Sequence, residues 1–340
     1  MRKPLFKIRE NGKFGFINEV GEVVIEAQYF EAEDFYNGFS RVRFNDKLVP
    51  LDELGRLLMK HLFNFVGYFE ENLARTQLVS LWGFIDTRGN QAIEVQYEDA
   101  RDFSEGMAAV RENGRYGFIN TEGEWLIQPQ YDVALEMKNN LAPVAFNNQY
   151  GYINTKGVMQ IKPQFDLAAS FQGDVAVIQK QKKWGIIDKN GNILIQPQFQ
   201  LIKHYSKGEF FDGRAIAVKN NKYGFVSQQG ELIVEPIYDI AGDFGEGLAL
   251  VALDGNYGYI NKEGDLLIRH KYEDAGVFSN GLAQVKVDGK WGFINKDGEL
   301  AIPTRFDEVY PFRSGLAWVR IGPVWAYINT EGRMIWREQG

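Results

Sequence analysis

The chain has 340 residues and a net charge of −7, and it contains no cysteine. The absence of cysteine excludes disulfides, thiolate metal ligands and a cysteine nucleophile, and the scattered lysines and arginines form no basic track for nucleic acid. The aromatic fraction of 14% is high, so the fold must accommodate many rings.

The first residues, MRKPLFKIRENGKFGFIN, contain no apolar run long enough for a secretory signal. No other stretch of the chain is apolar over the length of a transmembrane helix. We therefore expect a cytoplasmic protein that binds neither membranes nor nucleic acid.

The first predicted elements are a strand at 4–8 and a second strand around Phe14-Gly15. An aromatic residue followed by glycine then recurs, and the anchor glycines Gly83, Gly117, Gly151 and Gly185, and later Gly224, Gly258 and Gly292, are 34 residues apart. Residues 48–55 keep the frame of a second copy that has lost this signature. The sequence therefore predicts about ten tandem repeats.

The ninth repeat illustrates the elements predicted in each copy. Residues 282–287 and 290–295 alternate with the period of a strand, and Asp288-Gly289 between them is a strong hairpin signal. The second strand ends in a loop that closes on Gly298, where all ten copies have glycine, which predicts a left-handed backbone conformation. A third strand begins at residue 300, and the tail 306–312 is predicted as a crossover or a short fourth strand.

Both faces of the second strand carry apolar or very small residues, so each sheet is predicted to pack between two neighbours. The anchor glycine would let another backbone or ring approach closely. Interchange of large apolar groups at the position before it is typical of a core, and we assign Trp82, Trp184, Trp291 and Trp325 there. We expect an all-β open solenoid, curved or superhelical, of β-meander units; the alternative is a propeller-like closed ring.

The motif K-W-G-F-I-N at 290–295, with Gly298 behind it, and its counterpart at 183–188 resemble the WG-repeat family. The resemblance covers nearly the whole chain. It implies a β-rich, mainly bacterial protein with an interaction role, and it supplies no catalytic residue to carry over.

The regular frame is interrupted between Gly185 and Gly224, which are 39 residues apart. We therefore divide the chain into repeats one to six at 1–208, an insertion at 209–213, and repeats seven to ten at 214–340. The second copy also departs from the pattern, with an aromatic-rich tail at 63–69.

No H-E-x-x-H, G-x-S-x-G or phosphate-binding loop occurs in the sequence. A carboxylate follows the tail aromatic in six copies, as Glu98, Asp132, Asp166, Asp239, Glu273 and Asp307. We expect these acids to cap turns; a calcium ladder and a pair of hydrolytic acids are the alternatives. The chain is thus predicted to be no enzyme and to need no cofactor or metal, with an unrecognised acidic active site as the less favoured reading.

Since folding explains the repeated columns, residues that break the pattern are the functional candidates. We expect a non-enzymatic binding or scaffold protein with a protein partner; the alternative is a carbohydrate- or cell-wall-binding module that uses exposed aromatic rings. The candidate partner-binding residues are Lys203, His204, Tyr205, Lys207, Phe210 and Phe211 around the insertion, Phe65 and Tyr68 in the second copy, and Trp318 in the last, where we expect an exposed ring.

Overall fold

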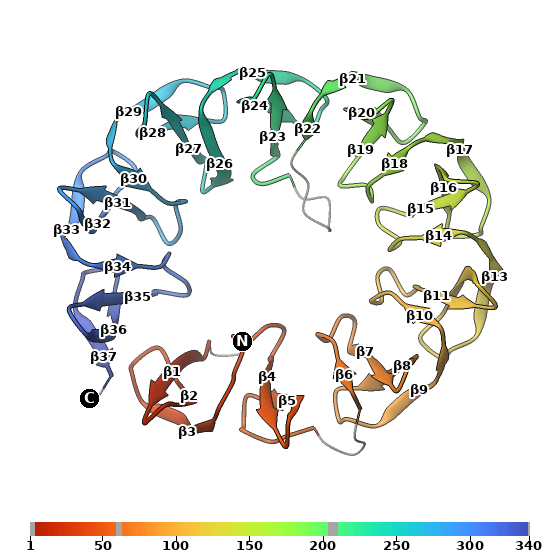
Figure 1. Ribbon diagram of the computed structural model, residues 1–340, viewed down its shortest axis with the longest axis horizontal. Coiled ribbons are helices and arrows are strands. Elements are labelled where there is room, and N and C mark those ends of the chain that lie inside the picture. Colours follow the sequence, from red (N-terminus) through yellow and green to blue (C-terminus); the bar gives the residue numbers. More distant parts are fainter. Residues whose placement is uncertain (1–3, 59–62, 203–209, 339–340) are drawn as a thin grey trace. The chain divides into compact units, whose positions relative to one another are not determined.

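The computed structural model describes residues 4–58, 63–202 and 210–338, which form strands and turns (Figure 1). No helix occurs in these ranges, so none that could span a membrane is found there. The chain divides into two compact units, Met1–Phe171 and Gln172–Gly340. The predicted all-β repeat architecture is confirmed, and the open solenoid, with the closed ring as its alternative, stays a prediction.

The strands of the first unit are β1 (Phe6–Glu10), β2 (Lys13–Ile17), β3 (Val23–Tyr29), β4 (Phe39–Phe44), β5 (Lys47–Asp52), β6 (Phe65–Val66), β7 (Leu73–Leu78), β8 (Leu81–Asp86), β9 (Gln91–Tyr97), β10 (Asp99–Ala100), β11 (Ala108–Glu112), β12 (Arg115–Ile119), β13 (Trp125–Tyr131), β14 (Val133–Ala134), β15 (Leu141–Phe146), β16 (Gln149–Asn154), β17 (Met159–Phe165) and β18 (Leu167–Ala168).

The strands of the second unit are β19 (Val175–Lys180), β20 (Lys183–Asp188), β21 (Ile193–Phe199), β22 (Leu201–Ile202), β23 (Arg214–Lys219), β24 (Lys222–Ser227), β25 (Leu232–Tyr238), β26 (Ile240–Gly245), β27 (Leu248–Leu253), β28 (Asn256–Asn261), β29 (Leu266–Tyr272), β30 (Asp274–Ala275), β31 (Ala283–Val287), β32 (Lys290–Ile294), β33 (Leu300–Phe306), β34 (Glu308–Val309), β35 (Leu316–Ile321), β36 (Val324–Asn329) and β37 (Met334–Arg337).

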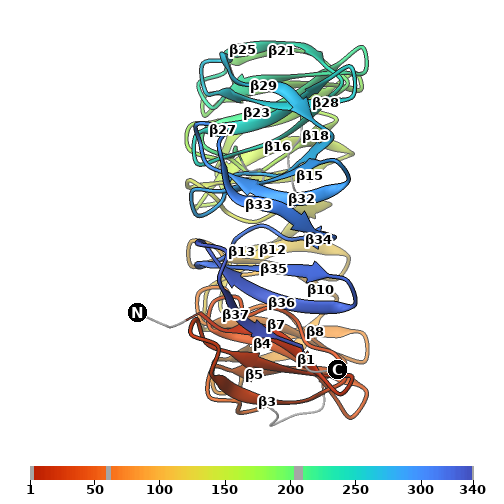
Figure 2. The ribbon, with the colours of Figure 1, turned by 90° about the vertical axis from the view of Figure 1, so that its left-hand side faces the viewer.

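A typical repeat forms a four-stranded antiparallel meander such as β10-β11-β12-β13. Its short first strand comes from the tail of the preceding repeat, and there Ala100 pairs with Val110. The predicted tail is therefore a short strand that opens the next sheet. Within the second unit, successive sheets such as those ending in β33 and β37 follow one another (Figure 2).

The second copy keeps the frame despite its lost signature. In the sheet β4-β5, Val42 pairs with Val49, as Ile8 pairs with the anchor glycine Gly15 in the first copy. The prediction of a hidden repeat is confirmed.

The anchor glycine lies where the last strand of its sheet bulges toward it. The pairing jumps from Trp291–Phe306 to Phe293–Ile302, so three residues of β33 lie opposite one of β32. A Cβ on Gly292, between them, would lie 2.6 Å from the Ile302 carbonyl oxygen and 2.8 Å from the Thr304 nitrogen. The approaching backbone thus belongs to the same sheet, and it leaves no room for a side chain.

The loop glycine is left-handed in every copy, as predicted. Its φ lies between 75° and 93° at Gly21, Gly55, Gly89, Gly123, Gly157, Gly191, Gly230, Gly264, Gly298 and Gly332. In the ninth repeat the Asn295 side-chain oxygen accepts hydrogen bonds from the Asp297 and Glu299 N–H groups, at 3.1 and 2.9 Å, which closes the loop. A Cβ on Gly298 would lie 3.3 Å from Ile268 in the preceding repeat, so this loop also joins neighbouring sheets.

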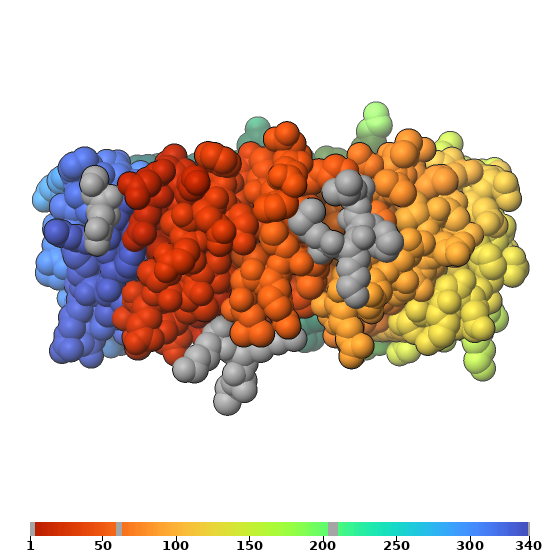
Figure 3. Space-filling view, turned by 90° about the horizontal axis from the view of Figure 1, so that it is seen from below, coloured from red at the N-terminus to blue at the C-terminus, as the bar shows by residue number. Residues whose placement is uncertain are grey.

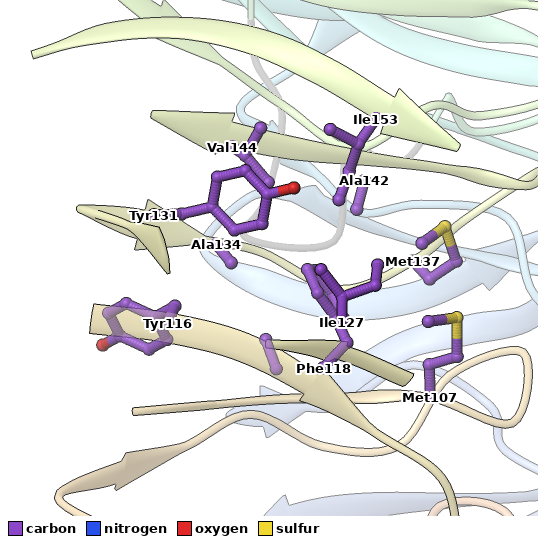
Figure 4. Close-up of a cluster of buried hydrophobic side chains, with 11 residues drawn as sticks. Met107, Tyr116, Phe118, Ile127, Tyr131, Ala134, Met137, Ala142, Val144 and Ile153 are labelled. Carbon is purple, nitrogen blue, oxygen red and sulfur yellow. The ribbon is translucent and has the colours of Figure 1, made fainter. Parts of the chain in front are cut away.

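The core lies between successive sheets, and both faces of a central strand are buried. Phe118 and Ile119 alternate along β12 and are each 0% exposed. One inter-sheet cluster combines side chains of two sheets (Figure 4): Met107, Phe118, Ile127 and Tyr131, then Ala142, Val144 and Ile153. Two-sided burial is therefore confirmed.

One of the four anchor tryptophans, Trp184, is buried as the core prediction requires, and two more are partly buried against core clusters. Trp184 is 9% exposed, and the two others are Trp82 and Trp291. Trp325 is half-buried instead in a separate group of rings, described below.

The insertion assigned to residues 209–213 is wrong. Phe210 is 7% exposed and Phe211 pairs with Arg214, as Phe278 is 2% exposed and Ser279 pairs with Leu282 in a regular copy. Since residues 210–213 form the ordinary loop, the five additional residues fall between Ile202 and Phe210. In the sequence the two phenylalanines look like part of the insertion, because the greater length of this repeat shows how many residues are added but not where they lie.

Replacing Gly292 by alanine should lower the free energy of unfolding by about 3 kcal/mol or more, because the added methyl group overlaps backbone atoms that cannot rotate away. The matched control is Gly289→Ala in the same hairpin, where φ is 73° and nothing lies within 4 Å of a new Cβ. Backbone strain alone should cost about 1 kcal/mol there. Chemical denaturation of both variants measures the difference, and equal losses would contradict a steric role for the anchor.

Candidate functional site

The acids that recur after the tail aromatic are used for folding. Five of the six accept a backbone N–H from the hairpin turn of their own sheet: Glu98 from Gly114, Asp132 from Asn147, Asp239 from Asp254, Glu273 from Gly289 and Asp307 from Gly322, at 2.6–3.1 Å. The turn-capping prediction is confirmed for these five. Within the described ranges, no group of three or more histidines, aspartates or glutamates could hold a metal ion.

Lysine side chains reinforce two of these caps. The Lys222 Nζ lies 2.5 Å from Asp239 and the Lys290 Nζ 2.5 Å from Asp307. The pKa of each aspartate lies below its ordinary value. The hydrogen bond from lysine lowers this pKa most, and the hydrogen bond from the turn N–H lowers it further. Both carboxyls are therefore ionised at neutral pH.

The melting temperature should fall in acid, and the double variant Asp239→Asn/Asp307→Asn should show a smaller fall. A folded-state pKa below the unfolded value means that the stabilisation is present above pH ~4 and is lost as the pH drops through the folded-state pKa. Melting curves between neutral pH and pH ~3 measure this effect. The exposed Asp297→Asn is the matched control, and a control that changes the pH profile as much as the double variant would contradict the assignment.

A second set of acidic side chains joins each loop to the next repeat. In the first unit, Glu105 accepts hydrogen bonds from the Asn139 and Asn140 N–H groups, at 2.6 and 2.8 Å. In the second unit, Glu246 accepts from the Gly281 N–H, and the Asn280 amide oxygen accepts from Gly315 at 2.7 Å. These acids are spaced one per repeat because they hold neighbouring repeats together.

One column of the array is variable, and it marks the candidate site. On the first long strand of each sheet this column holds small or aliphatic residues in five of the ten copies, namely Ala109, Pro143, Val177, Ile216 and Leu250, and it holds Lys7 in the first copy and Gln284 in the ninth. The second and third copies have Arg41 and Arg75 there, and the last has Trp318. Each of these three is surrounded by aromatic rings.

Arg41 is fixed on several sides. It makes two hydrogen bonds to Glu33, at 2.6 and 2.8 Å, and one to the Val66 carbonyl in the next sheet at 3.1 Å. Its guanidinium carbon lies 4.2 Å from the centre of the Tyr68 ring. Burial raises the pKa of Glu33, but the hydrogen bonds from Arg41 and Tyr68 outweigh burial and hold that pKa below its ordinary value. Glu33 is therefore the counter-ion of Arg41.

Arg75 repeats this arrangement one sheet further along. It donates to the Ala100 carbonyl at 3.2 Å and forms an ion pair with Asp102 at 3.0 Å. Its guanidinium lies 5.7 Å from the Phe65 ring and 5.3 Å from the Trp82 ring. Arg41 also lies 5.7 Å from Phe65, so rings and guanidinium groups alternate across the sheets.

Two tyrosines at the loop end of this group each donate a hydrogen bond to a glutamate of the neighbouring repeat. The Tyr68 hydroxyl donates to Glu33 of the preceding repeat at 2.7 Å, and the Tyr36 hydroxyl donates to Glu70 of the following repeat at 3.1 Å. Their rings are 5.4 Å apart at 70° and are exposed by 37% and 42%. We call Tyr36, Arg41, Phe65, Tyr68, Arg75 and Trp82 the arginine–aromatic cluster; the part of the chain that contains it is coloured red to orange in Figure 3.

The last repeat carries a second group of rings, in the other unit. Trp318 stacks on Trp325 at 5.4 Å and 4° and on Trp336 at 5.8 Å and 26°, and Tyr310 lies 6.1 Å from Trp325. We call these four residues the tryptophan cluster. Trp318 is half-buried between two indoles, so the expectation that it is the exposed ring is wrong; Tyr310, at 48%, is the exposed one.

The predicted partner-binding residues thus separate. Phe65 and Tyr68 meet around Arg41, and Trp318 lies in the second unit. Phe210 is buried and Phe211 half-buried in a regular loop, which removes Phe210 as a binding anchor. Lys203, His204, Tyr205 and Lys207 lie outside the described residues.

Sequence reasoning missed Tyr36, Arg41 and Arg75. The available signal was the column itself, because aligning the ten copies places two arginines where the others have mainly apolar residues. A search for insertions and surplus rings does not compare residues within a column.

A family model described as a WG containing repeat matches residues 14–47, 82–116, 116–150, 150–184, 184–223, 223–257, 257–291 and 291–322. The second copy, which the strand pairing reveals, falls between the first two matches. No curated protein matches the chain.

Solved structures with a similar fold share little sequence. A crystal structure of a eukaryotic initiation factor has a TM-score of 0.52 and 10% identity, covering 99% of this chain and 96% of that one. PorZ, a bacterial surface component of the type-IX secretion system of Porphyromonas gingivalis, has a TM-score of 0.31 and 12% identity, covering 100% and 59%. Kluyveromyces lactis Hsv2p has 0.35 and 10%, covering 71% and 98%. The first of these likenesses concerns the fold alone, because only 10% of the residues are identical.

Proposed function

Because this chain belongs to the family of WG-containing repeats, we propose that it is a non-enzymatic binding or scaffold protein that presents its arginine–aromatic cluster to a protein partner. The single observation that carries the proposal is the pair Arg41 and Arg75 in a column that elsewhere holds mainly apolar residues. In a repeat array the positions that recur in every copy are explained by folding, so the positions where the copies differ are the candidates for function.

The composition of the cluster supports a protein partner. Tyrosine, tryptophan and arginine are the residues most enriched among the energetically dominant contacts of protein interfaces. Arg41 and Arg75 are held by carboxylates and carbonyls, so their geometry is set before a partner arrives. Fixing such side chains in advance lowers the entropic cost of association.

The recurring carboxylates support a role other than catalysis. Glu98 and Asp307 accept backbone N–H groups in hairpin turns, and Glu105 accepts them across a repeat boundary. A hydrolytic pair needs acids placed around one substrate bond, whereas these acids are distributed one per repeat and serve the same structural purpose in each.

The double variant Tyr68→Ala/Trp82→Ala should lose partner capture by about tenfold or more while remaining folded, because the loss of two interface anchors costs at least about 2 kcal/mol. The measurement is affinity capture from a lysate of the source cells, quantified by mass spectrometry, with melting curves as the folding check. The matched control Leu267→Ala/Leu300→Ala removes two exposed apolar side chains from the second unit. Full capture by the cluster variant, or equal loss in the control, would contradict the proposal.

The tryptophan cluster favours a second candidate function, carbohydrate binding. Stacked indoles beside the exposed Tyr310 offer ring faces to a sugar, and Arg320 and Glu308, 3.3 Å apart, lie beside them: Arg320 is 5.7 Å from the Trp325 ring. These groups could donate and accept hydrogen bonds from hydroxyls.

A glycan array should decide between the two candidates. Saturable binding that Tyr310→Ala abolishes, together with no recovered protein partner, would establish the carbohydrate function. Capture of a protein through the arginine–aromatic cluster with no array signal would eliminate it.

A further inference from the structure

We propose that Tyr36 and Tyr68, with Glu33 and Glu70 beside them, form a docking site for a cationic side chain, an arginine or lysine of the partner. This inference rests on the proposed function, since it names the chemistry that the arginine–aromatic cluster recognises. We call these four residues the tyrosine dock.

The tyrosine dock is rigid because its hydrogen bonds cross the repeat boundary in both directions. Tyr68 reaches back to Glu33 and Tyr36 reaches forward to Glu70. The Asn37 amide, next to Tyr36, donates to the Phe69 carbonyl at 3.0 Å and fixes the same loop. Both rings therefore keep their orientation while more than a third of each stays exposed.

The site already holds a cation against a tyrosine ring. The guanidinium of Arg41 lies 4.2 Å from the centre of the Tyr68 ring and is paired with Glu33. A cation over an aromatic face beside a carboxylate is thus the geometry that this part of the chain stabilises. Tyr36 and Glu70 present the same two groups at the exposed end of the dock.

The charge balance around the rings favours a positive ligand. Among the described residues, the carboxylates in or beside the dock are Glu33, Asp34 and Glu70, and the cations are Lys7 and Arg41. Lys7 lies 3.7 Å from Asp34, and the Arg41 side chain is only 13% exposed. Three carboxylates against two cations that are already paired with them favour a cation over an anion.

A fluorescent peptide of alternating arginine and glycine is a suitable probe, and the same peptide with citrulline in place of arginine is its neutral isostere. Fluorescence anisotropy of the full chain at low ionic strength should show binding of the arginine peptide and at least about tenfold weaker binding of the citrulline peptide, because charge-assisted hydrogen bonds and the cation–π contact both require the positive charge. Equal binding of the two peptides would overturn the inference.

The variants Tyr36→Leu and Glu70→Gln should each weaken the arginine peptide by about fivefold, the effect of one such contact at a partly exposed site. The matched controls Phe30→Leu and Glu263→Gln change an exposed aromatic ring and an exposed glutamate outside the dock and should leave binding unchanged. Equal weakening by the controls would mean general attraction to an acidic protein and would overturn the dock. Melting curves confirm that each variant is folded.

The same variants separate this inference from the proposed function. If Tyr36→Leu retains full partner capture while Tyr68→Ala/Trp82→Ala loses it, the partner uses the cluster and the cationic dock is refuted. If the arginine peptide binds with the expected variant pattern and no protein is captured, the dock stands and the protein-partner proposal fails.

Discussion

The close approach between the anchor glycine and the bulged last strand is the constraint on which the eight sheets with an anchor glycine depend. At Gly292 the Ile302 carbonyl occupies the space of a side chain, so the third strand bends over the second instead of continuing flat. The bend places the aliphatic residues of the last strand against the loop glycine of the next repeat, as Ile268 lies against Gly298. The geometry inside one sheet thus positions the residues that contact the next sheet. This explains why the anchor glycine is accompanied by the loop glycine.

Much of this fold follows from the sequence because the constraints are local and repeated. The glycine in the loop of all ten copies predicted the left-handed φ that the structure has there. Apolar residues on both faces of the second strand predicted two-sided burial, which the structure shows at Phe118 and Ile119. A length difference was less informative, because it shows how many residues are added and not where; the burial of Phe210 and the pairing of Phe211 with Arg214 assign both residues to the ordinary loop. The site was partly predictable: Phe65 and Tyr68 stood out as surplus rings, whereas Arg41 and Arg75 become significant once their column is seen to lie between sheets.

The second and third repeats show how a repeat array acquires a specific surface without losing its framework. Arg41 and Arg75 replace apolar side chains between sheets, and each is compensated by a carboxylate and by a carbonyl of the adjoining sheet. Buried charge is tolerated in a protein when such partners are present. Because the partners come from neighbouring repeats, the whole group of rings and charges is assembled by stacking rather than by any single copy.

The loop-to-loop hydrogen bonds also determine where the chain accepts a change of length. The Gly247 N–H donates to the Asp212 carboxylate 35 residues before it, the same separation as Glu246 and Gly281 in the regular repeats that follow. The five additional residues precede Phe210, where the bond from the Gln172 amide to the Phe210 carbonyl spans 38 residues, against 33 for the bond from Ser279 to Phe312 in a regular repeat. Ile202 still pairs with Ala217 on one side of them, and Phe210 stays buried on the other. The stretch before the loop phenylalanine is therefore the point at which foreign sequence could be grafted into the array without disturbing the register of the copies that follow.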